Sequence, residues 1–376
     1  MNIFKSNSKK KNSGKLKFTK NSFLNKKRLL PFVAVFGLLG GYLVYRSFAY
    51  TPLLNGSDGE FVALAPTRIM DTRNGNGGYS SAISANGTYS LQVADRGGVP
   101  AVEGVRAVVL SVATVNPSAN GYLTVWPSGV SRPTVSNINY VSGQTIANQV
   151  TVPVGADGKI QFFSSAQAHL IVDVSGYYSS ENGIPGARYN SLAPARILDT
   201  RNGIGGYSTA LTGNGVYDIS VMDVGGVPVS NVSAVVVNVV AVNPASNGYA
   251  TIWPKGAPKP EASSLNYIAG KNVAKLVTVP VGSDGKVSLF SSGSSTNFIF
   301  DVAGYYSSDI TPDTVKTQGG RFVSINPARI MDTRNGTGGF SKAIPENGTY
   351  SLNVLGVGGV PNSNVSAVVV NIGVVN

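Results

Sequence analysis

Short runs of β-branched and aromatic residues, separated by Gly, Pro, Asn and Asp, recur along most of the chain. Such runs predict β-strands, because these side chains suit a pleated surface and the intervening residues suit turns. In the first copy of the pattern the predicted strands cover 107–115, 121–126, 143–154, 159–165 and 169–178. Segments GADGK and GSDGK contain Asp-Gly pairs that predict hairpin turns. No stretch outside the N-terminal region has convincing helical periodicity, so we expect an all-β fold of antiparallel sandwich or jelly-roll type, with ~8–10 strands per unit.

The strand pattern belongs to an internal repeat. The blocks RIMDTRNGNGG, RILDTRNGIGG and RIMDTRNGTGG begin at Arg68, Arg196 and Arg329. Each unit closes with a second motif, IVDVSGYYSS from Ile171 and IFDVAGYYSS from Ile299. The opening motif therefore occurs three times and the closing motif twice, which predicts tandem copies of one domain.

The repeat boundaries follow from these motifs and from Gly-, Pro- and polar-rich segments between them. We expect repeat 1 at 61–180, a linker at 181–188, repeat 2 at 189–308, a linker at 309–321 and a truncated repeat 3 at 322–376. Position 376 corresponds to the middle of the unit. A half-sandwich would expose unpaired strand edges, so we expect this sequence to be a fragment of a longer protein.

The N-terminus combines a basic tail with an apolar run. Residues 1–28 contain ten Lys or Arg, and an uncharged, mainly apolar run covers 29–45 before Arg46. As a helix at 1.5 Å per residue this run is about 25 Å long, just short of a ~30 Å hydrocarbon core. We expect one transmembrane helix at 29–46, a cytoplasmic tail at 1–28, a linker at 47–60 and exported repeats. Two alternatives are a buried core helix and a signal peptide that is cleaved after Ala49, which would release the repeats as a secreted protein.

The net charge of +12 comes almost entirely from this N-terminal region. Eleven basic residues precede residue 47, and the rest of the chain has 19 basic and 18 acidic residues. The repeats therefore lack the charge excess that a nucleic-acid-binding surface needs, and we expect no nucleic-acid partner. The chain has no Cys, which excludes disulfides and thiolate metal sites.

The two motifs resemble those of repeat modules in secreted or cell-surface proteins of Gram-positive, especially actinobacterial, bacteria. The shared pattern is P-x-R-[IL]-x-D-T-R-x-G-x-G-G at the start of a unit and V-D-V-x-G-Y-Y at its end, and the resemblance covers 61–376. It implies an accessory module, in some proteins joined to a wall hydrolase or protease. Because no such partner domain is recognisable here, the enzymatic roles of those proteins do not carry over.

The opening motif places basic and acidic residues close together. We predict an ion pair that joins the first strand of a unit to its last, with Arg68, Asp71, Arg73 and Asp173 in repeat 1. The corresponding residues of repeat 2 are Arg196, Asp199, Arg201 and Asp301. A Ca²⁺ site on Asp71 and Asn74 is the alternative, although the adjacent Arg73 opposes a cation. A phosphate cradle on the glycines lacks the following Lys-Ser/Thr and helix, so we expect neither metal nor cofactor.

The only tryptophans, Trp126 and Trp253, occupy equivalent positions in the two repeats. In YLTVW and YATIW the aliphatic residues alternate with Tyr, Thr and Trp, so a core-facing aliphatic side leaves the aromatics on the outer face. This arrangement predicts a stacking platform for sugar rings. Its members are Trp126, Tyr122 and Tyr140 in repeat 1, and Trp253, Tyr249 and Tyr267 in repeat 2. The alternative is that the aromatics pack beneath a loop or against a neighbouring repeat.

Catalytic residues are scarce. His169 is the sole histidine and its counterpart in repeat 2 is Asn297, while paired Glu residues do not recur between the units. We therefore expect no enzymatic activity. Our first hypothesis is a membrane-anchored extracellular β-repeat protein in surface adhesion or envelope-glycan binding. The alternatives are a non-binding structural stalk and the accessory region of a wall hydrolase.

Overall fold

The computed structural model describes residues 59–180, 186–307, 320–323, 325 and 327–374. The predicted transmembrane segment 29–46, its basic tail and the cleavage position after Ala49 lie outside the described residues. Within the described ranges there is no helix of sufficient length and apolarity to cross a membrane.

Repeat 1 forms eight strands, as the β-branched runs predict. They are β1 (Phe61–Asp71), β2 (Gly87–Gln92), β3 (Val105–Val115), β4 (Gly121–Pro127), β5 (Ile138–Tyr140), β6 (Ile146–Pro153), β7 (Lys159–Ser164) and β8 (His169–Ser179). One 3₁₀ turn, η1 (Val102–Gly104), precedes β3. At the predicted hairpin between β6 and β7, Gly158 has the positive φ of 76° that only glycine adopts without strain.

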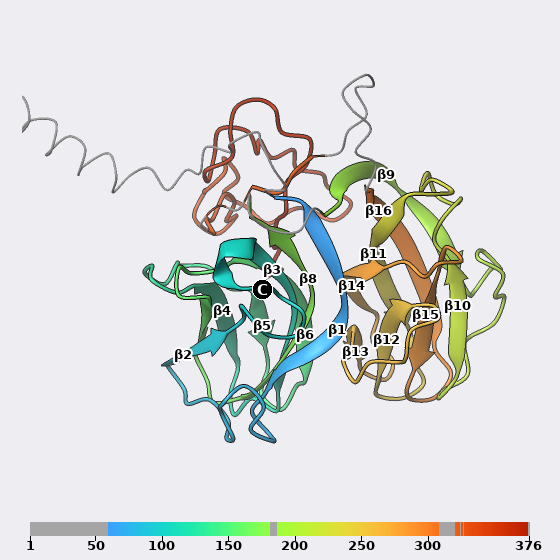
Figure 1. Ribbon diagram of the computed structural model, residues 1–376, viewed down its shortest axis with the longest axis horizontal. Coiled ribbons are helices and arrows are strands. Elements are labelled where there is room, and N and C mark those ends of the chain that lie inside the picture. The colour runs from blue at the N-terminus through green and yellow to red at the C-terminus, as the bar shows by residue number, and fades with distance from the viewer. Residues whose placement is uncertain (1–58, 181–185, 308–319, 324, 326, 375–376) are drawn as a thin grey trace, which may run out of the picture. The chain divides into compact units, whose positions relative to one another are not determined.

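Repeat 2 has the same eight strands in the same order (Figure 1). They are β9 (Arg188–Asp199), β10 (Val216–Ser220), β11 (Val232–Val242), β12 (Gly248–Pro254), β13 (Leu265–Tyr267), β14 (Val273–Pro280), β15 (Lys286–Ser291) and β16 (Asn297–Ser307). Strand β9 begins at Arg188, inside the predicted linker 181–188.

The strands of each repeat form two four-stranded antiparallel sheets. In repeat 1 the orders are β1-β8-β3-β6 and β2-β7-β4-β5, and in repeat 2 they are β9-β16-β11-β14 and β10-β15-β12-β13. The pairing is nested: first with eighth, second with seventh, third with sixth, and fourth with fifth. This arrangement is a jelly roll, which confirms the predicted all-β fold with antiparallel sheets. A buried apolar cluster lies between the sheets of each repeat.

The nested pairing explains the different structure of residues 327–374, which correspond to the first half of a unit. Strands of the first half bond to partners in the second half, so an isolated first half cannot build the ladders. No strand is assigned within the described part of this segment. Its turns persist: the Asp332–Thr337 bridge matches Asp71–Asn76 in repeat 1.

A β-bulge interrupts the pairing of β1 with β8 between Arg68 and Met70. The extra residue allows both Ile69 and Met70 to enter the core, while Arg68 stays opposite Asp173 on β8. The corresponding shift in repeat 2 lies opposite Phe300 and Asp301.

Candidate functional site: the interfaces between repeats

The predicted ion pair between first and last strands is present in both repeats. Arg68 Nε donates to Asp173 Oδ1 at 2.8 Å, and Arg68 Nη1 lies 3.5 Å from Asp71 Oδ2. In repeat 2, Arg196 Nε donates to Asp301 Oδ1 at 2.8 Å. Register places each pair directly opposite across the neighbouring strands, so the contact joins the first strand of each repeat to its last.

The aspartate of the DTR motif serves its own loop as well. Arg73 donates from Nε and Nη2 to the two oxygens of Asp71, at 2.9 and 2.7 Å. Arg201 and Asp199 make the same contact in repeat 2, at 2.8 and 2.6 Å. These hydrogen bonds lower the pKa of Asp71, and they lower that of Asp199 to about 2. No cluster of three or more His, Cys, Asp or Glu suited to a metal occurs among the described residues.

The predicted aromatic platform is wrong for both tryptophans. Trp126 is 2% exposed and Trp253 is 5% exposed, although both lie on the outer side of their strands, opposite the core-facing aliphatic residues. The loop between β4 and β5 covers Trp126, whose Nε1 donates to Val130 O at 3.2 Å. In repeat 2, Trp253 Nε1 donates to Ala257 O at 3.0 Å. The alternation of residues in a strand predicts the side of the sheet on which a side chain lies. It does not predict which loop folds over that side.

The platform tyrosines divide between core and surface. Tyr140 and Tyr267 are buried, and Tyr140 Oη lies 2.7 Å from Ser164 Oγ, so they are not available to a sugar ligand as predicted. Tyr122 is 37% exposed and Tyr249 is half-buried.

Buried tryptophan and threonine hold the β4–β5 loop in a defined position. Besides the Trp126 bond, Thr124 Oγ1 donates to Val135 O at 2.6 Å, and Val125 N donates to Asn137 Oδ1 at 2.7 Å. Arg132 completes the loop by lying 3.6 Å from the centroid of the Phe163 ring. The side chains of the strand therefore determine where the loop's carbonyl groups point.

In repeat 2, carbonyl groups of the equivalent loop bind repeat 1. Arg68 Nη2 donates to Glu261 O at 3.3 Å, and Ser111 Oγ on β3 donates to Ser263 O at 3.3 Å. Both acceptors lie in the β12–β13 loop, which is the β4–β5 loop of repeat 2. Arg68 therefore contacts both Asp173 of its own repeat and the loop of repeat 2, and the Asp173 carboxylate orients the guanidinium for the second contact. We call this contact interface 1–2.

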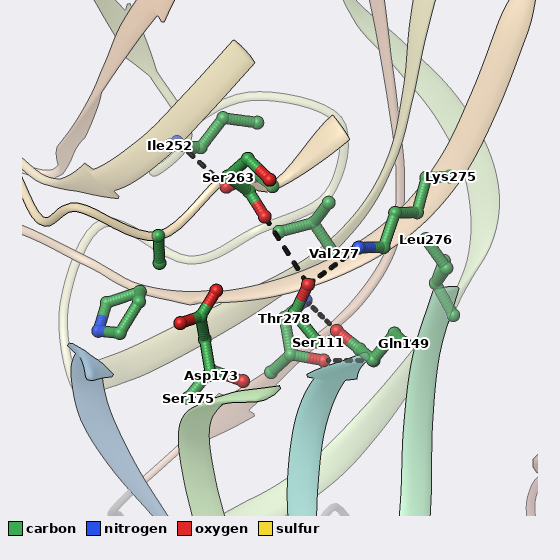
Figure 2. Close-up of a pocket in the computed structure, with 13 residues that line it drawn as sticks. Ser111, Gln149, Asp173, Ser175, Ile252, Ser263, Lys275, Leu276, Val277 and Thr278 are labelled. Atoms are coloured by element: carbon green, nitrogen blue, oxygen red, sulfur yellow. Dashed lines mark hydrogen bonds between the residues drawn. The ribbon is translucent and has the colours of Figure 1, made fainter. Parts of the chain in front are cut away.

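A buried lysine lies at the centre of interface 1–2 (Figure 2). Lys275 on β14 is 5% exposed, and its Nζ donates to Ser111 Oγ at 2.9 Å. Burial lowers the pKa of Lys275 to about 7, and burial raises the pKa of the Asp173 carboxyl across the interface. Nearby, Gln149 and Thr278 exchange two hydrogen bonds, with Thr278 N donating to Gln149 Oε1 at 2.8 Å.

A second interface, which we call interface 3–1, has the same design. Arg329 Nη2 donates to Thr134 O at 3.5 Å, and Asn371 Nδ2 donates to Ser136 O at 2.6 Å. Aligning the repeats makes Arg329 equivalent to Arg68, Asn371 to Ser111, and the two acceptors to those of the β12–β13 loop. Asn148, which is the counterpart of Lys275, donates to Asn371 Oδ1 at 3.2 Å.

The first residues of the three repeats also contact one another in a cycle. Phe61 N donates to Ala187 O, Tyr189 N donates to Gly320 O, and Phe322 N donates to Gly59 O, at 2.7, 3.0 and 2.8 Å. The donors are equivalent positions and so are the acceptors, so each repeat contacts the next and the third contacts the first. Between these pairs, Glu60 accepts hydrogen bonds from Arg188 at 3.3 Å and from Arg321 at 3.1 Å.

An apolar cluster accompanies this cycle of contacts. It contains Phe61, Ala107, Val109, Tyr178, Ala187, Ala234, Val236 and Tyr306, with Ala63, Tyr189 and Phe322 packed against it. The Tyr178 and Tyr306 hydroxyls, from the closing motifs of repeats 1 and 2, are hydrogen-bonded to each other. Phe322 stacks on Tyr178 with ring centroids 4.1 Å apart.

Sequence reasoning missed most of the interface residues, because Ser111, Gln149 and Lys275 belong to no recognisable motif. Comparing the two repeats would have singled out Lys275, since a lysine in a strand replaces Asn148 within an otherwise similar segment. His169 has a structural role: its Nδ1 lies 2.9 Å from Thr72 Oγ1, and Asn297 makes the same contact with Thr200.

Comparison with known proteins gave no family. No family model matches the chain, and no curated protein matches it. Among solved structures, the N-terminal CBM22-1-CBM22-2 tandem domain from Paenibacillus barcinonensis Xyn10C is 11% identical and has a TM-score of 0.19, covering 66% of this chain and 99% of that chain. The PBSX exported protein XepA is 14% identical, also with a TM-score of 0.19, covering 67% and 89%. Likenesses at this level support no conclusion about this protein.

Proposed function

We propose that this protein is a structural display module of the bacterial cell envelope, in which jelly-roll repeats dock on one another outside the cell. The observation that carries this proposal is the recurrence of one set of contacts at interfaces 1–2 and 3–1. Two residues that recur between repeats, the first arginine of the opening motif and the buried tryptophan, act in docking. This favours the structural alternative over the aromatic platform.

A matched pair of double variants tests the docking role. Arg68→Ala with Ser111→Ala removes two donors of interface 1–2, whereas Arg196→Ala with Asn238→Ala changes the equivalent positions on the uncovered face of repeat 2. We expect the first variant to expand the protein in small-angle scattering and to speed amide exchange in the loop around Ser263, with little change in the second. Equal behaviour of the two variants would contradict docking through these residues.

We also propose that residues 29–46 anchor the module in the membrane, with the tail 1–28 in the cytoplasm. The support comes from the basic tail followed by an uncharged apolar run. Protease added to intact cells should digest the repeats but leave the tail protected. N-terminal sequencing of the released protein distinguishes the alternative, because cleavage after Ala49 would give a chain that begins at Tyr50.

Glycan binding remains a second candidate because one part of the expected aromatic surface is exposed. Tyr122 is accessible beside Phe163, with ring centroids 5.7 Å apart, and Tyr249 lies 5.8 Å from Phe290 in the same arrangement. Retention of the protein on purified cell-wall polysaccharide and peptidoglycan tests this function. Saturable retention that a Tyr122→Ala/Tyr249→Ala variant loses, while it stays folded, would establish glycan binding. Absence of retention on both materials would exclude them as ligands.

A further inference from the structure

Repeat 2 carries the same docking surface as repeat 1, but within the described residues no other repeat covers it. The surface is the outer side of sheet β9-β16-β11-β14, with Arg196, Asn238, Leu276 and Asp301 in the places of Arg68, Ser111, Gln149 and Asp173. The side chains of the covered pair, Arg68 and Asp173, are 17% and 4% exposed. Those of Arg196 and Asp301 are 40% and 24% exposed.

The residues of this surface are already held in the docking arrangement. Arg196 is fixed by two hydrogen bonds to Asp301, at 2.8 and 3.2 Å, and by a third to Asp199 at 3.2 Å. Asn238 is the same residue type as Asn371, which donates to Ser136 O in interface 3–1. Leu276 presents an apolar side chain that is 41% exposed. Because the guanidinium is already oriented, a partner that offers backbone carbonyl groups would lose little entropy in binding it.

The two occupied interfaces show what kind of partner fits. In each, the arginine and the polar residue of the third strand bind two carbonyl groups of a β4–β5 loop. A residue of the partner's sixth strand, Lys275 or Asn148, bonds to the same polar residue. Both loops of this kind in the described residues are already engaged, one by repeat 1 and the other by repeat 3. The partner for repeat 2 is therefore the equivalent edge of another repeat.

The position of the third repeat indicates that it is the repeat that docks on repeat 2. Its first residues pair with Tyr189 of repeat 2 and with Gly59 of repeat 1. Its third-strand segment lacks cover, since Val369 and Ile372 are 67% and 82% exposed, whereas their counterparts in repeat 1, Val109 and Val112, are buried. A second half of this repeat would cover that segment and place a β4–β5 loop in sequence after it.

We propose that the outer sheet face of repeat 2 is a docking surface for the β4–β5 loop and sixth strand of a complete third repeat, so that three repeats close a cycle through three equivalent interfaces. This inference rests on the proposed docking function. It adds a specific partner, with two carbonyl groups for Arg196 and Asn238 and an apolar or threonine side chain against Leu276.

An extended chain tests this proposal. Residues 244–307 are appended after Asn376, so that the second half of repeat 2 completes the third repeat.

Because the chain has no Cys, two introduced cysteines are the only thiols in the protein. The test pair combines Asn238→Cys with a second cysteine in the appended segment, at the position that corresponds to Ser263. The control pair, Ser111→Cys with Ser263→Cys, reports on interface 1–2. A short bifunctional thiol reagent is added to dilute protein, and intramolecular products are measured by mass spectrometry.

We expect both pairs to cross-link with similar yield, and amide exchange around Arg196 and Asp301 to become about ten-fold slower in the extended chain. If the control pair reacts and the Asn238→Cys pair does not, the docking surface on repeat 2 is wrong while the proposed function stands. If the control pair also fails, the proposed docking function itself is wrong. A second extension, built from residues 117–180, replaces the first if that one does not fold by circular dichroism.

Discussion

Repeats 1 and 2 have the same eight strands, but their outer sheets have different neighbours. The Arg68–Asp173 pair of repeat 1 lies under the loop of repeat 2, whereas the Arg196–Asp301 pair of repeat 2 is more open to solvent. A second difference lies on the sixth strand, where repeat 1 has Asn148 and repeat 2 has the buried Lys275. From this comparison we expect the two ion pairs to contribute differently to stability, because burial determines how much a charged group depends on its partner.

The largest expected effect is the loss of either tryptophan. Trp253→Ala should lower the free energy of unfolding by about 3–5 kcal/mol, because it empties a buried site and frees the loop that contacts repeat 1. Trp126→Ala should have a similar cost but act on the loop that contacts residues 329–371. Each variant keeps one tryptophan, so fluorescence during urea unfolding reports on the repeat that was not changed. A loss below about 1 kcal/mol would contradict the observed burial.

The arginines provide the most direct test of the difference between the repeats. Arg68→Ala leaves the buried carboxylate of Asp173 without its partner and should cost about 3 kcal/mol or more. Arg196→Ala changes a more exposed pair and should cost about 1 kcal/mol or less. Chemical denaturation of both variants under the same conditions measures the difference. Equal costs would mean that the cover from repeat 2 does not shield the pair.

Lys275 should make interface 1–2 sensitive to pH. Its pKa is about 7 in the folded protein, against an ordinary value of 10.5, so the unfolded chain binds more protons between these two values. Stability should therefore rise with pH across this window, and the additional stability should be lost as pH falls toward 7. Lys275→Asn introduces the residue of repeat 1 and should remove this rise. Thermal unfolding of both proteins across the window checks it, and parallel pH profiles would contradict the assignment to Lys275.

An effect smaller than that of the tryptophans or of Arg68 is expected at the apolar cluster shared by the repeats. Tyr178→Phe removes one of two buried hydroxyls that bond to each other and should cost about 1–2 kcal/mol. Tyr177→Phe is a neighbouring control, since Tyr177 belongs to the core of repeat 1 and not to the shared cluster. Double-variant cycles with Tyr306→Phe should show a coupling between Tyr178 and Tyr306, whereas the control should show none.

Much of the fold was predictable because it depends on local and repeated patterns. The runs at 107–115 and 121–126 became β3 and β4, and the Arg68–Asp173 pair followed from two motifs that occur at the ends of a unit. The bulge near Ile69 was not predictable, because a single inserted residue leaves no mark in an alternating pattern. The exposure of Trp126 was wrongly predicted because the covering loop is polar and irregular, with no periodicity of its own.

By itself the sequence determined the repeated unit, its β-strands and the charged residues that join the first strand to the last, because periodicity and motif spacing encode these features directly. Only the tertiary structure decided which sides of those strands are covered. Trp126 and Trp253 became supports for the loops that fold over them. Ser111 and Lys275 became interface residues through a contact between segments more than a hundred residues apart. Such contacts depend on how whole sheets pack together, which no local pattern specifies.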